Sequence, residues 1–139
     1  MVASLAMALS AGILLLLGSL HLLYTFVGPK LRPRDPRLIE HMQADTLVLT
    51  RRTTVWKAWI GFNASHSLGG ILFGLVYGYL ALVEPAFLFA SKFLLAVALG
   101  LLACLLVLAW RYWFRIPLTG VALALACCLF AVIAGANVG

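Results

Sequence analysis

Residues 93–110 read FLLAVALGLLACLLVLAW, a run in which no position holds Asp, Glu, Lys or Arg. Three further stretches share this property, residues 1–29, 58–83 and 116–139. Crossing roughly 30 Å of hydrocarbon takes about 20 helical residues, and backbone amides in lipid must be hydrogen-bonded within the segment. Each stretch therefore predicts a helix that spans a membrane.

The composition of the chain favours the same class of protein. Of its 139 residues, 65% are hydrophobic and only 10% are charged, whereas a soluble domain carries about 25% charged residues. The apolar runs are continuous and do not alternate, which argues against barrel strands. We expect an all-α integral membrane four-helix bundle that forms a single domain over residues 1–139, with spans at about residues 3–27, 56–82, 86–110 and 116–137.

The predicted starts of the third and the first span depend on different signals. The third is expected to begin near Pro85, because proline suits the first position of a helix, and Lys92 would then reach from its first turns to the headgroups. The N-terminal run MVASLAMALSAG has no basic residue. A secretory signal needs a basic region there, so we expect the first span to be retained as a helix.

The predicted cytoplasmic loop, residues 28–55, is the largest polar segment. Asp35 suits a helix N-cap and Pro36 the first helical position. The following RLIEHMQADTLVLTRR places Leu38, Met42 and Leu49 on one stripe. We expect a short amphipathic helix here that lies at the membrane interface and leads up to the second span.

Basic residues are unevenly distributed between the loops. Seven of the ten lie between the first two spans, and Arg111 and Arg115 lie between the last two. By the positive-inside rule both loops are cytoplasmic, so we expect a multi-pass protein of the bacterial inner (plasma) membrane with both termini outside. All four tryptophans flank these loops, as an interfacial belt would: Trp56, Trp59, Trp110 and Trp113. The net charge of +6 then predicts contact with anionic lipid headgroups and not with nucleic acid.

A polar cluster interrupts the apolar spans. Successive helical residues turn by about 100°, so Trp59, Asn63 and His66 share a face that continues into the glycines of the second span. His21 and Thr25 share a face of the first span. At 1.5 Å per residue, His21 and Asn63 both lie roughly 10 Å below the cytoplasmic surface, with His66 about one turn deeper. We expect these side chains to face protein and to meet.

The predicted pocket has His21, His66 and Asn63 at its centre, backed by Thr25, Trp59, Ser65 and Ser67. Three uses fit it. His21 and His66 could ligate a haem iron or a metal; no carboxylate or thiolate lies at that depth, which favours haem over zinc. His66, His21 and Asn63 could instead serve acid/base catalysis on a lipophilic substrate, as in an isomerase or oxidoreductase. The pocket could also bind a quinone or lipid head without chemistry.

A structural role is the competing interpretation. A neutral histidine held by an amide across a helix pair stabilises packing by about 0.6 to 2 kcal/mol. Small residues recur at the spacing of close helix contacts, at Gly70, Gly74 and Gly78 and again at Gly120 and Ala124. A thin four-helix bundle has little interior, so we expect a homo-oligomer. In this alternative the chain is a non-enzymatic oligomeric membrane protein whose histidines fix the helix register.

The segments HLLYTF (residues 21–26) and WKAWIGFNASHSLGG (residues 56–70) resemble those of small bacterial four-span membrane proteins that share no agreed activity. In size and layout the chain is also similar to the MAPEG glutathione-dependent enzymes and to styrene oxide isomerase. The latter resemblance implies a haem ligated by histidine between protomers, and here it rests on His21 and His66. The Arg/Asn/Glu pattern of MAPEG enzymes is not reproduced, because no Glu follows Arg51 and Arg52 inside the second span.

Overall fold

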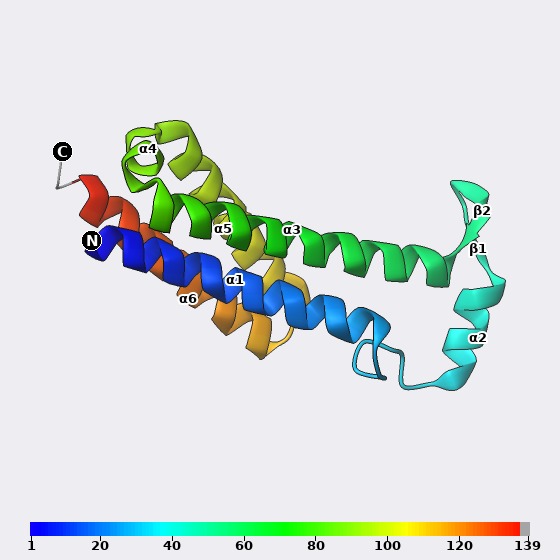
Figure 1. Ribbon diagram of the computed structural model, residues 1–139. Coiled ribbons are helices and arrows are strands. Elements are labelled where there is room, and N and C mark those ends of the chain that lie inside the picture. The colour runs from blue at the N-terminus through cyan, green and yellow to red at the C-terminus, as the bar shows by residue number, and fades with distance from the viewer. Residues whose placement is uncertain (137–139) are drawn as a thin grey trace. The chain divides into compact units, whose positions relative to one another are not determined.

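A computed structural model describes residues 1–136 of the chain. Within them lie six helices and one antiparallel pair of short strands (Figure 1). The elements are α1 (Val2–Phe26), α2 (Pro36–Ala44), β1 (Thr46–Leu47), β2 (Thr50–Thr54), α3 (Val55–Val83), α4 (Pro85–Ala90), α5 (Lys92–Tyr112) and α6 (Arg115–Ala136). The predicted all-α class is thus confirmed, apart from the small hairpin. Four helices, α1, α3, α5 and α6, are long and apolar enough to cross a membrane.

Three of the predicted spans agree with these helices to within one residue where the structure describes them. They are α1, α3 and α6. The predicted end of the last span, residue 137, lies outside the described residues. The agreement follows from the sequence, because none of these three helices carries a proline beyond its first turn that would break it.

The third span begins later than predicted. The chain forms a separate short helix, α4, and α5 starts only at Lys92. Between them Ser91 has an extended backbone, and its side chain accepts a hydrogen bond from the backbone N–H of Leu94 at 3.3 Å. Serine is a strong N-cap because its oxygen satisfies a first-turn N–H that has no partner in the helix. The helix therefore restarts at Ser91 instead of continuing from Pro85.

The amphipathic helix of the first loop is shorter than predicted. Asp35 caps α2 as expected, with its carboxylate accepting from the backbone N–H of Arg37. The helix stops at Ala44, and residues 46–54 form the β1–β2 hairpin. Four of these nine positions are threonine and one is valine, and β-branched side chains favour strands. Leu49 consequently lies in the hairpin turn and not on the helical stripe.

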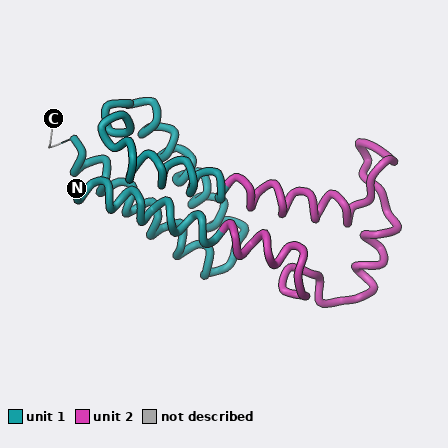
Figure 2. The backbone as a smooth tube through the Cα atoms, in the orientation of Figure 1, with its two compact units in different colours: residues 1–17, 70–139 teal, residues 18–69 magenta. Residues whose placement is uncertain are grey.

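The chain divides into two compact units, residues 1–17 with 70–139 (unit 1) and residues 18–69 (unit 2), shown in Figure 2. The core of unit 1 is built mainly from small and medium apolar side chains: Met7, Ala11, Leu14, Phe73, Tyr77, Ala81, Leu88, Ala98, Leu102, Ala124, Cys128 and Ala131. Two polar groups are satisfied inside unit 1. The buried Ser10 hydroxyl donates to the carbonyl of Ala124 at 2.7 Å, and the Tyr77 hydroxyl donates to that of Leu94 at 2.8 Å.

Two helices of unit 1, α1 and α3, approach each other closely at Gly74. A Cβ placed on this glycine would lie 2.5 Å from Leu15 Cβ and 2.8 Å from the carbonyl oxygen of Ala11. The predicted glycine ridge is therefore used at this position to bring α1 and α3 together. At Gly78 the same added atom would meet only Ala11 Cβ, at an ordinary 3.8 Å.

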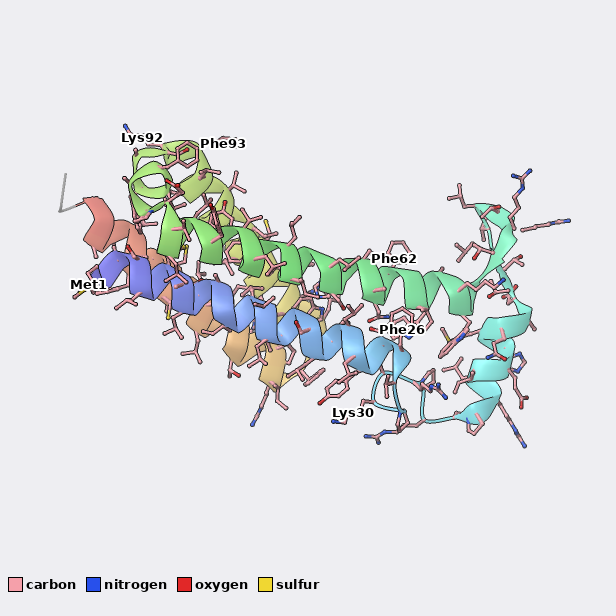
Figure 3. The ribbon with its side chains drawn as sticks, in the orientation of Figure 1. Met1, Phe26, Lys30, Phe62, Lys92 and Phe93 are labelled. Atoms are coloured by element: carbon pink, nitrogen blue, oxygen red, sulfur yellow. The ribbon has the colours of Figure 1, made fainter. Side chains whose placement is uncertain are left out.

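Unit 2 holds the end of α1, the loop elements and the start of α3. Its buried residues are few and small, namely Gly18, Thr25 and Ser67. Apolar side chains on both helices remain exposed; Phe62 is 73% exposed and lies on the side of α3 away from α1 (Figure 3). Unit 2 is thus a helix pair with open outer faces, and the polar cluster lies in it.

Candidate functional site

The predicted meeting of His21 and Asn63 is confirmed. His21 Nε2 lies 3.0 Å from Asn63 Oδ1, a hydrogen bond that joins α1 to α3 within unit 2. Helix rise alone placed the two residues at one depth, and each also falls on the face of its helix that meets the other. The bond is partly buried, so it is stronger than the same contact in water.

The amide of Asn63 defines the tautomer of His21. Asn63 Nδ2 donates to the backbone carbonyl of Trp59 at 2.8 Å. Because a carbonyl only accepts, the amide nitrogen must face Trp59 and the amide oxygen must face His21. The His21 Nε2 therefore carries the hydrogen, which leaves Nδ1 as the acceptor nitrogen of the neutral ring. Trp59 thus takes part through its backbone and not through its indole.

His66 lies against His21. The two ring centroids are 5.3 Å apart, and the ring planes meet at 86°, an edge-to-face arrangement. His66 is exposed at the surface of unit 2, whereas His21 is half-buried. The three residues at the centre of the predicted site are therefore brought together, with His66 as the member open to the surroundings.

The three hydroxyl residues of the predicted site bond to their own helices. Thr25 donates to the carbonyl of His21 at 2.8 Å, Ser67 to that of Asn63 at 2.7 Å and Ser65 to that of Phe62 at 3.1 Å. Such bonds to a carbonyl three or four residues back are a common way for hydroxyls to be satisfied inside a helix. The protons of these hydroxyls are thus used locally, and only their oxygen lone pairs remain for a ligand.

The expectation that these polar groups all face protein is wrong. Thr25 and Ser67 are buried, but Ser65 and His66 are exposed and Trp59 is 41% exposed. Within unit 2 the start of α3 has the end of α1 as its helical neighbour, and this pairing covers Thr25 and Ser67 but not Ser65 or His66. The site is a polar patch on the side of a helix pair and not an enclosed pocket.

The histidine pair does not fit a haem held between its rings. Axial ligands on opposite sides of an iron point a nitrogen at each other across the metal, whereas these rings meet edge to face. His21 Nε2 is also already bonded to Asn63. A metal centre finds no further ligands: among residues 1–136, no three His, Cys, Asp or Glu side chains could hold a metal ion together, and zinc sites need three or four.

One contact beside the site was missed by the sequence argument. The Lys30 ammonium lies 4.0 Å from the centroid of the Tyr24 ring. Gly28, with φ of +80°, turns the chain between these two residues, and glycine adopts this conformation without the steric cost that a side chain would bring. The sequence features that could have predicted this contact are the tyrosine in HLLYTF and the lysine that follows the turn in GPK. The contact places a positive charge at the end of α1, about one turn beyond His21.

Comparisons of this chain with protein-family models, with curated proteins and with solved structures find no match. The chemistry of the cluster must therefore be inferred from its own groups. These are a proton-donating imidazole fixed by an amide, a second imidazole at its edge, and an apolar surface around both.

Proposed function

We propose that this chain is a multi-pass protein of the bacterial inner membrane, with both termini outside, whose His21–Asn63–His66 cluster binds a lipophilic molecule through its polar group. The observation that carries the proposal is the orientation of His21 by Asn63 at hydrogen-bond distance, with His66 at 5.3 Å. An ionisable side chain in a membrane span costs free energy that leucine does not, so two of them in contact favour a functional site.

The exposure of His66 supports entry of the ligand from the side. A molecule dissolved in the acyl chains reaches an exposed residue of α3 without passing through the protein. A neutral imidazole carries one donor and one acceptor nitrogen, a chemistry that suits a carbonyl or hydroxyl such as that of a quinone. The same pair can exchange a proton with a bound substrate, so acid/base chemistry at this site is the enzymatic form of the proposal.

Photolabelling tests this function. The purified protein, reconstituted in phosphatidylcholine vesicles, is irradiated with a short-chain azido-quinone, and labelled peptides are identified by mass spectrometry. We expect labelling within residues 58–70 that is lost in His66→Ala and largely kept in His66→Gln, whose amide still forms hydrogen bonds. Ser65→Ala is the matched control, because Ser65 is exposed beside His66 but bonds to its own helix, and it should label like the wild type. Equal labelling of wild type and His66→Ala would overturn the proposal.

A second candidate is a non-enzymatic homo-oligomer, and a specific observation favours it. The His21–Asn63 bond by itself ties α1 to α3 in the sparsely packed unit 2, and exposed apolar residues such as Phe62 and Leu20 leave room for neighbouring copies. This candidate predicts that His21→Ala lowers the mass of the detergent-solubilised particle measured by light scattering, and that no His66 variant changes labelling. The two functions are thereby distinguished.

A further inference from the structure

The turn of the β1–β2 hairpin presents two apolar side chains. Leu47 pairs with Thr50 across the hairpin, so the turn consists of Val48 and Leu49. Their relative exposures are 110% and 92%. No residue of unit 2 covers them, and full exposure of adjacent large apolar side chains to water is unfavourable. The pair is therefore an apolar tip that a partner outside the chain could cover.

Turn chemistry does not explain this pair. Two-residue hairpin turns favour Asn, Asp and Gly, because the turn types that match strand twist need positive φ. Among residues 1–136 no non-glycine residue has a positive φ. Val48 and Leu49 therefore cannot form the turn types that match the twist of the two strands. A β-branched residue at such a turn contradicts local preference, and contradictions of this kind concentrate at functional sites.

Positive charge adjoins the apolar turn. Arg51 and Arg52 follow it on β2, and both are exposed. Each arginine close to an anionic membrane surface strengthens attachment about fivefold, the equivalent of about 1 kcal/mol. Apolar side chains beside arginines are complementary to the membrane interface, where acyl chains lie next to phosphates. Water would not accommodate the apolar side chains as well, and an apolar protein surface would not accommodate the arginines as well.

The hairpin is joined directly to the start of α3. β2 ends at Thr54 and α3 begins at the next residue. The Val55 N–H donates to the carbonyl of Asp45 at 3.0 Å, and Thr54 Oγ1 accepts from the Lys57 N–H at 3.3 Å. Figure 1 shows the hairpin and α2 beyond the ends of α1 and α3, with α2 running across the direction of the two long helices. The hairpin is thus held next to the first turn of α3.

We propose that the β1–β2 hairpin is a membrane-anchoring finger, in which Val48 and Leu49 insert into the interface of the bilayer and Arg51 and Arg52 bind the phosphates of anionic lipids. This inference rests on the proposed membrane location of α1 and α3, but not on any role of the histidine cluster. The partner is a lipid surface, and the site is the tip of the finger.

Site-specific crosslinking tests the finger. The photoreactive amino acid p-benzoylphenylalanine is placed at position 48 of the full-length chain, which is reconstituted in nanodiscs of phosphatidylcholine and phosphatidylglycerol in equal parts. After irradiation, we expect adducts with the mass of a lipid on the peptide that contains the turn. The same amino acid at Glu40, an exposed acidic position of α2, is the matched control and should give several-fold fewer lipid adducts.

Substitution of the two arginines gives a second test of the finger. Arg51→Gln with Arg52→Gln should remove the preference for phosphatidylglycerol adducts over phosphatidylcholine adducts, whereas Arg111→Gln, in a different loop, should retain it. Adducts to a second copy of the chain, or equal lipid adducts at positions 48 and 40, would overturn the finger. Failure of the chain to enter nanodiscs would instead overturn the membrane location, so the two failures are distinguishable.

Discussion

Asn63 makes two hydrogen bonds in different directions, one to the backbone of its own helix and one to His21 on α1. The first removes the freedom of the amide to rotate, and the second transfers that constraint to an imidazole. The depth of these residues and their helical faces could be predicted from the sequence, because both depend only on helix rise and twist. The exposure of His66 could not, because exposure depends on which neighbours pack against α3.

The His21–Asn63 bond should be measurable as a coupling free energy. We expect a double-mutant cycle of His21→Ala and Asn63→Ala to give a coupling of about 0.6 to 2 kcal/mol, the range for side-chain hydrogen bonds between membrane helices. The free energy of unfolding is measured by titration with dodecyl sulfate in mixed micelles. The control cycle pairs His21→Ala with Ser65→Ala and should be additive, since Ser65 bonds only to its own helix. Equal coupling in both cycles would contradict the bond.

At the scale of elements, α1 packs closely on α3 in unit 1 at Gly74. An added Cβ at Gly74 would meet backbone atoms of α1, which cannot move without displacing the helix. The sequence indicated a ridge of three glycines but not which of them makes the contact, because the spacing is the same for all. The structure shows a close contact at Gly74 and ordinary spacing at Gly78.

We expect Gly74→Ala to lower the free energy of unfolding by about 1 to 3 kcal/mol, the usual penalty for overpacking. Gly69→Ala is the matched control on the same helix, where an added Cβ meets nothing within 4 Å. It should be neutral or raise stability by at most about 1 kcal/mol, because alanine has the higher helix propensity. Both are measured by the same titration, and similar stabilities for the two variants would contradict the close approach.

Two elements were misjudged from the sequence for a shared reason. A stripe of apolar residues predicted a helix through Leu49, and the preference of proline for the first helical position predicted a start of the third span near Pro85. In each case a local preference determined the observed structure. The threonines of residues 46–54 favour strands, and Ser91 caps a new helix. Periodicity averages over many residues, and a favourable first residue says nothing about where a helix breaks, so neither signal reports a local interruption of one or two positions.

For the whole molecule, the four apolar helices follow directly from composition, whereas their orientation is a proposal from the distribution of charge. We expect alkaline phosphatase fused after residue 136 to be active and green fluorescent protein inserted after Glu40 to be fluorescent, because the former requires export and the latter the cytoplasm. A fusion of phosphatase at Glu84, between α3 and α4, should also be active. An active phosphatase at Glu40 would reverse the topology.

The direct passage of β2 into α3 has a mechanical implication. Asn63 lies eight residues after Val55, about 12 Å along one unbroken helix at 1.5 Å per residue. If the proposed finger is held by lipids, a change in lipid thickness or headgroup charge would act on the end of the same helix that carries Asn63, the partner of His21. With the finger seated among lipids, the bilayer itself would act as an effector of His21.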